Sequence, residues 1–205
     1  MLFRSLHRMI LLSRVYRLSG VASEQSLSGG NSYYLCRTPI RMESQVIRDS
    51  LLKLSGQLEE KLGGPPIDPA SQASSSRRSL YFRQSRDHQH KFIGMFDDAD
   101  ILRCYRRQES IIPQQALTLA NSRIAFQAAS KIAGNLSSGS LSDRDFAQTA
   151  FQLILCRKPD SEEVKACTEA LDQFRLLAQG KENQVRTRTL LVLGLLNSND
   201  FITIR

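Results

Sequence analysis

Histidine and aspartate residues gather in the segment Asp87–Asp100, where their types and spacing could hold a metal ion. His88 and His90 are two positions apart, so both could ligate one ion from an extended segment. The carboxylates of Asp97 and Asp98 could complete a shell of hard ligands. No second motif fixes the geometry, and a polar loop whose side chains face water explains the same residues. The segment is therefore a candidate metal site, with a solvated loop as the alternative.

Three arginines follow this segment and precede a helix that we expect to begin at Pro113. Arg103, Arg106 and Arg107 could bind an anion or a partner at this loop-to-helix junction, helped by the positive N-terminus of the helix. They could equally pair with the acidic residues of the stretch 97–109 and organise the junction internally. Because those acidic residues lie close to the arginines in the sequence, we favour internal ion pairs.

Patterns typical of enzymes do not occur in the sequence. There is no G-x-S-x-G elbow, and the glycine pairs 29–30 and 63–64 lack the spacing and flanking strand of a phosphate-binding loop. The four cysteines form no C-x-x-C and no zinc-ligand spacing with histidine, and no C-x-x-C-H haem attachment is present. We therefore predict no catalytic residue and no cofactor, and favour a non-enzymatic role for this chain alone.

Length and composition describe a globular chain. The 205 residues are 41% hydrophobic and 23% charged, with no apolar run of membrane-spanning length. The formal net charge of +8 permits binding to nucleic acid or to an anionic surface. Basic residues spread over many helices are, however, typical of solvated faces and local ion pairs. A nucleic-acid-binding module is therefore only a second alternative.

Apolar residues recur every three or four positions along much of the chain, which predicts amphipathic helices. One helix of about twenty residues spans Met42–Leu62 and is ended by the Gly-Gly-Pro-Pro run at 63–66. A long helix begins at Pro113 and reaches Leu136. The segment Gln184–Leu196 is apolar on most sides, which indicates a helix buried among the others.

Residues at the starts of the other helices have capping patterns. Ser142 is followed at the third position by Asp145, and Asp160 by Glu163, as in a capping box. The segment Met1–Ser23 has the basic composition of an organellar transit peptide but also helical apolar spacing. We favour an ordinary amphipathic core helix there, and see no export signal.

These elements predict an all-α protein, an irregular bundle of about six helices with a long, polar, loop-rich connector between the second and third. We expect an N-terminal helical part at 1–64, the connector at 65–110 and a C-terminal helical part at 111–205. All three parts would form one domain.

Six landmarks, in order along the chain, resemble the planctomycete-type domain of unknown function 1553. The most specific is the run from Cys104 to Ser122, with the arginines before Pro113 and the sequence Pro-Gln-Gln-Ala-Leu. The other five are Leu6–Arg17, Arg41–Pro65, Arg77–Tyr81, Arg157–Glu163 and Leu196–Phe201. Ser44 and Gln45 depart from the Ala and Glu that are usual in the family.

The resemblance implies a context but no reaction, so no catalytic residue can be carried over. Family members are typically long exported proteins in which this domain follows a domain of unknown function 1549. The chain is thus expected to be an N-terminally truncated member, a structural or binding module of an assembly in the periplasm or cell envelope. Its partner could be a domain 1549 in a neighbouring or upstream frame. The alternative is an accessory part of a hydrolytic or redox assembly with a metal site at Asp87–Asp100.

Overall fold

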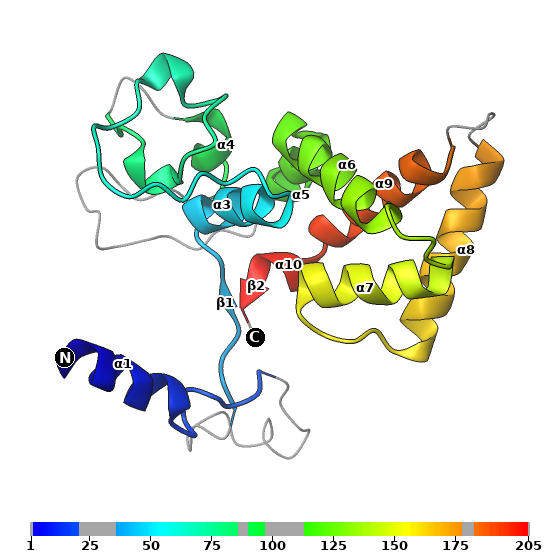
Figure 1. Ribbon diagram of the computed structural model, residues 1–205, viewed down its shortest axis with the longest axis horizontal. Coiled ribbons are helices and arrows are strands. Elements are labelled where there is room, and N and C mark those ends of the chain that lie inside the picture. The colour runs from blue at the N-terminus through cyan, green and yellow to red at the C-terminus, as the bar shows by residue number, and fades with distance from the viewer. Residues whose placement is uncertain (1, 21–35, 86–89, 97–112, 178–182, 205) are drawn as a thin grey trace. The chain divides into compact units, whose positions relative to one another are not determined.

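The computed structural model describes residues 2–20, 36–85, 90–96, 113–177 and 183–204 (Figure 1). Contacts divide the chain into two compact units, one made of residues 1–41 and 203–205 and the other of residues 42–202. Apart from one two-stranded pairing and isolated bridges, the regular structure of the described residues is helical. The predicted all-α class is confirmed.

The smaller unit contains helix α1 and a short antiparallel pairing. Helix α1 spans Leu2–Leu12, and strand β1 (Ile40–Arg41) pairs with β2 (Thr203–Ile204). The helix predicted near the N-terminus is confirmed, but none of its residues is buried, and Phe3 is 78% exposed. The expectation of an ordinary core helix was therefore wrong about burial.

The larger unit begins with helix α3, which is shorter than predicted. It spans Ser44–Leu54, and Gly56 beyond it has a φ of 71°. Glycine adopts this left-handed conformation without steric cost, so it ends the helix well before the glycine pair at 63–64. The amide of Leu58 already turns back to donate to the carbonyl of Leu52, 3.1 Å away. The predicted helix to Leu62 was therefore too long by about two turns.

The described part of the loop that follows contains short helical turns and isolated bridges. The 3₁₀ helices η1 (Pro69–Ser71) and η2 (Ser79–Tyr81) precede α4, a single turn at Lys91–Gly94. Isolated bridges join Glu59 to Arg77 and Ile67 to Phe82.

The long helix predicted from Pro113 is two helices. Helix α5 spans Pro113–Asn121 and α6 spans Arg123–Ser137. Ser122 between them is extended, and its hydroxyl accepts a hydrogen bond from the amide of Ala125 as an N-cap. A serine that caps the second helix competes with continuation of the first, which the apolar periodicity alone does not reveal.

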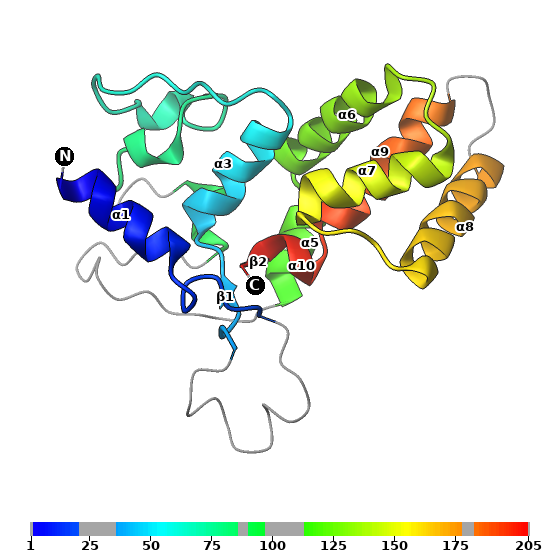
Figure 2. The ribbon, with the colours of Figure 1, turned by 60° about the horizontal axis from the view of Figure 1, so that its bottom comes forward.

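The described part of the larger unit contains four further helices (Figures 1 and 2). They are α7 (Asp143–Leu155), α8 (Ser161–Leu177), α9 (Asn183–Leu196) and α10 (Asn199–Ile202). Helix α6 packs mainly on α9, and α8 packs on both α7 and α9. One hydrophobic core joins them, with Ile132, Phe146, Leu171 and Leu196 fully buried. Packing around this core holds the helices beside one another. Polar contacts between side chains join several of their ends.

Both predicted caps are present. The hydroxyl of Ser142 accepts from the amide of Asp145 at 3.2 Å. Asp160 and Glu163 form a reciprocal capping box, with amide-to-carboxylate distances of 2.7 and 2.9 Å. The guanidinium of Arg157 adds two hydrogen bonds to Glu163 and binds Asp200 of α10 at 2.8 Å. This Arg157 clamp ties the α7–α8 turn to the C-terminal turn of the unit.

The hydrogen bonds from Arg157 lower the pKa of Glu163 from its usual 4.5 to about 2. A carboxylate with a depressed pKa stabilises the fold above its unfolded pKa, and this contribution is lost as the pH falls toward 2. We therefore expect Glu163→Gln to lower the free energy of unfolding at pH 7 by about 1–2 kcal/mol, since the pair is partly exposed.

Denaturant unfolding at several pH values measures this effect. The gap between Glu163→Gln and the parent protein should close between pH 4.5 and pH 2. The exposed neighbour Glu162 lies in the same first turn of α8, so Glu162→Gln controls for the helix dipole and should cost less than about 0.5 kcal/mol. A gap that does not change with pH would contradict the prediction.

Candidate functional site

Most of the side chains singled out from the sequence lie outside the described residues. These are His88, Asp97 and Asp98 of the candidate metal site and the arginines Arg103, Arg106 and Arg107. His90 is described: its Nδ1 accepts a 3.4 Å hydrogen bond from the amide of Ile93, and its ring lies 5.2 Å from that of Phe82. Within the described ranges, no three His, Cys, Asp or Glu residues are placed to hold one metal ion. The metal site and the arginine pairing remain predictions.

The structure instead brings together two of the sequence landmarks, at the contact between α3 and η2. Arg48 of α3 is 1% exposed, and its guanidinium donates to the carbonyl of Arg77 at 3.0 Å and to the hydroxyl of Ser79 at 3.1 Å. It also donates to the carbonyl of Ser75 and lies 4.5 Å from the centre of the Phe82 ring. Burial lowers the pKa of Arg48, and the adjacent Asp49 opposes this shift.

Asp49 binds the same turn from the next position of α3. Its carboxylate accepts from the amide and the hydroxyl of Ser79, at 2.9 and 2.7 Å, and from Arg48 at 3.2 Å. The pair therefore fixes the loop to α3 through hydrogen bonds that neutralise the buried charge of Arg48 and the partly buried charge of Asp49. We call Arg48, Asp49 and Ser79 the α3–η2 junction.

A cavity of about 1160 Å³ opens beside this junction. The lining includes the loop segment 72–76 and the first turns of α4 and α6, with Lys91 and Arg123. Arg48 of the junction also lines it, together with the apolar side chains of Leu52, Phe92 and Ile124. We call this cavity the α4–α6 pocket.

The charged residues in the described lining of the α4–α6 pocket all have one sign. Arg48, Lys91 and Arg123 line it, and the described lining includes no aspartate or glutamate. Lys91 and Arg123 are exposed, and neither forms an ion pair with any other described residue. No described residue neutralises Lys91 or Arg123, so these two cations are available to an anion, whereas Arg48 is already engaged in the α3–η2 junction.

A second cavity of about 860 Å³ lies against Asp49 and has mixed charges. Glu43, Glu60, Lys53 and Arg78 line it. Lys53 pairs with Glu60, and the guanidinium of Arg78 lies 3.9 Å from the carboxylate of Asp49. Both cations of this cavity therefore already have carboxylate partners, unlike Lys91 and Arg123 among the described residues.

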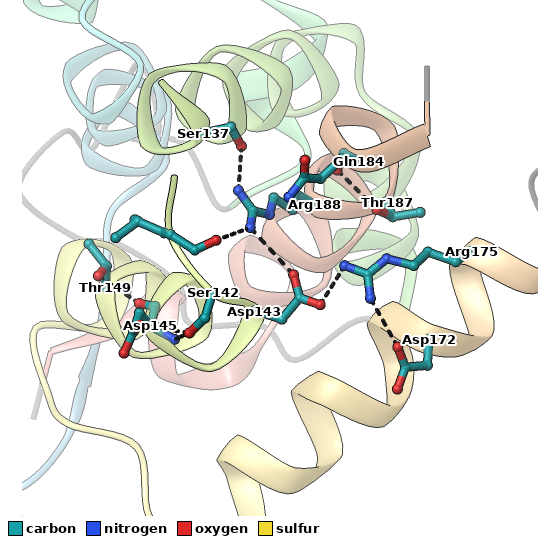
Figure 3. Close-up of polar contacts among 11 residues, drawn as sticks. Ser137, Ser142, Asp143, Asp145, Thr149, Asp172, Arg175, Gln184, Thr187 and Arg188 are labelled. Atoms are coloured by element: carbon teal, nitrogen blue, oxygen red, sulfur yellow. Dashed lines mark hydrogen bonds and ion pairs between the residues drawn. The ribbon is translucent and has the colours of Figure 1, made fainter. Parts of the chain in front are cut away.

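A separate polar network surrounds Arg188 of α9, as Figure 3 shows. Its guanidinium, 1% exposed, donates to the carbonyl of Leu141 at 2.7 Å and to the hydroxyl of Ser137 at 3.1 Å. Its Nη2 also lies 3.4 Å from the carboxylate of Asp143, which binds Arg175 of α8 as well. The Arg188 network therefore links α6, α7, α8 and α9.

Sequence reasoning did not single out Lys91, Arg123 or Arg188, nor the contact between Arg48 and Ser79. The sequence did contain a signal for Arg188, because an arginine within an apolar helix that is expected to be buried needs a polar partner. Nothing local marks Lys91 and Arg123, which acquire a shared role only when α4 and α6 lie beside the loop 72–76.

Comparison with known proteins agrees with five of the six landmarks, while the landmark Leu196–Phe201 lies beyond the matched residues. A family model described as PSD1, protein of unknown function (DUF1553), matches residues 2–171. No match was found among curated proteins or among solved structures. In the described part of the chain, every helix is too short or too polar to cross a membrane.

Proposed function

Since the chain belongs to the DUF1553 family of unknown function, we propose that it is a helical binding module of an envelope-associated assembly. The α4–α6 pocket is the observation that carries this proposal. Pockets that bind small molecules have a similar size and combine apolar lining with a few placed polar groups. Here Leu52 and Phe92 supply apolar surface, and Lys91 and Arg123 supply the polar groups.

The rigidity of the pocket wall supports binding. The loop that forms this wall is held by Arg48, whose guanidinium has backbone acceptors at Ser75 and Arg77. The side chain of Gln72 donates to the carbonyl of Arg83 at 3.0 Å and is buried as well. A wall held before the ligand arrives loses little conformational entropy on binding, which favours affinity.

The resemblance supports the envelope location and a domain of unknown function 1549 as the partner. Purified chain and purified domain 1549 should elute together from a size-exclusion column, earlier than either alone. Separate elution at micromolar concentrations would count against this partner.

Filling the α4–α6 pocket should abolish ligand binding. Ala73 is exposed in the pocket wall, so Ala73→Trp places an indole in the cavity without removing a charge. A thermal shift screen of small metabolites should find compounds that raise the Tm of the parent protein; at a hundred times Kd the stabilisation is about 2.7 kcal/mol. The same compounds should leave the Tm of Ala73→Trp unchanged.

The matched control is Ala166→Trp, because Ala166 is exposed on α8 and does not line the pocket. This variant should respond to the compounds as the parent does. If no compound raises the Tm of the parent, or if Ala73→Trp keeps the full response, the pocket is not a binding site and the proposal fails.

A further inference from the structure

We infer that the α4–α6 pocket takes a small organic molecule bearing an oxyanion, with Lys91 and Arg123 as its cationic contacts. The inference rests on the proposed binding role and names the class of ligand. An oxyanion here means a phosphate, a sulfate or a carboxylate group, since all three present oxygen acceptors with negative charge.

The first support is a positive charge that no carboxylate in the described lining compensates. Lys91 lies in the first turn of α4 and Arg123 in the first turn of α6, and both line the same cavity. The described lining has no carboxylate to neutralise them, whereas the acids near Arg48 and Arg78 belong to the second cavity. An anion in this cavity would gain charge-assisted hydrogen bonds from such cations, and the planar guanidinium of Arg123 suits a bidentate contact.

The start of α6 gives the second support. Helix α6 is 15 residues long, and its Ser122, Arg123 and Ile124 line the pocket. The Ser122 hydroxyl satisfies the amide of Ala125, whereas the first amides of a helix have no acceptor within it. The amides of Arg123 and Ile124 and the positive end of the helix dipole therefore favour an anion beside Arg123.

The remaining lining indicates an organic ligand rather than a bare ion. The cavity of about 1160 Å³ far exceeds the volume of inorganic phosphate and is partly lined by Leu52, Phe92 and Ile124. The lining also includes the serines 74–76 and Gln127, which lies one turn after Arg123 on α6. Hydroxyl and amide groups at such positions suit the hydroxyl groups of a sugar or a similar polar body.

Calorimetric titration at low ionic strength tests the class of ligand. The probes are glucose 6-phosphate, glucose 6-sulfate and glucuronate, with glucose as the uncharged control and inorganic phosphate as the bare ion. At least one charged sugar should bind about tenfold or more tightly than both glucose and inorganic phosphate. The preference among the three identifies the oxyanion.

The double variant Lys91→Gln/Arg123→Gln should weaken binding of that sugar at least about tenfold. Lys131→Gln/Arg144→Gln removes the same charge from exposed positions outside the pocket and should bind as the parent does. Circular dichroism should give the parent spectrum for both, because Lys91 and Arg123 hold no described ion pair.

The outcomes separate the two proposals. Uncharged compounds could bind as tightly as the charged sugars, with Ala73→Trp abolishing the binding of both. In that case the proposed binding role stands and the assignment of an oxyanion ligand is wrong. If a charged sugar binds equally well to the Lys91/Arg123 double variant, the assignment of these side chains is overturned. If no probe binds and the wider screen also finds nothing, both proposals fail.

Discussion

Arg188→Ala is expected to lower the free energy of unfolding by about 3–5 kcal/mol, the largest effect of any substitution considered for this chain. The substitution leaves the carbonyl of Leu141 and the hydroxyl of Ser137 without their buried donor. It also opens a cavity beside Phe146, whose ring centre lies 4.5 Å from the guanidinium. Urea unfolding monitored by circular dichroism measures the loss.

Arg186 provides a matched control on the same helix. It lies two residues before Arg188 and is exposed, so Arg186→Ala should change the free energy of unfolding by less than about 0.5 kcal/mol. Arg188→Met fills the volume of the arginine side chain but makes none of its hydrogen bonds. Its loss of unfolding free energy should therefore lie between those of Arg186→Ala and Arg188→Ala. Equal effects of Arg186→Ala and Arg188→Ala would show that the buried network contributes nothing specific.

Arg48→Ala should destabilise the larger unit by about 3 kcal/mol and should release the loop 65–85 from α3. Its guanidinium supplies the donors for the carbonyls of Ser75 and Arg77, and its removal leaves Asp49 without its buried cation. Hydrogen exchange should therefore lose protection in this loop more than in α6–α9. The effect also reaches the α4–α6 pocket, because the loop forms its wall.

Lys53→Ala is the control for Arg48→Ala, because Lys53 lies on the same helix and its ion pair with Glu60 is well exposed. An exposed ion pair contributes less than about 1 kcal/mol. Loop protection should be unchanged in Lys53→Ala. Loss of protection spread evenly over the larger unit in Arg48→Ala would contradict a specific role of Arg48 in holding the loop.

Much of the helical architecture could be predicted from local sequence. The capping box at Asp160 and Glu163, the serine cap at Ser142 and the helix at Gln184–Leu196 depend on contacts within a few residues, and each is present. Caps and apolar periodicity act within one segment of chain, so a single sequence is enough to reveal them.

Helix ends that depend on competition between two local signals were predicted less well. Gly56 ends α3 where apolar spacing would allow continuation, and Ser122 divides the helix expected from Pro113. In both cases a single residue with a strong conformational or capping preference outweighs the apolar stripe that runs past it.

The sequence by itself determined the all-α class, the caps and the family landmarks, because these depend on residues close together along the chain. Tertiary structure alone decided the site. Arg48 meets Ser79 across 31 positions, and Lys91 lines one cavity with Arg123 although neither residue has a local signal. Burial of the core brings these segments together. As a result, Lys91 and Arg123 at the starts of α4 and α6 line one cavity, and the described lining of that cavity contains no carboxylate to balance their charge.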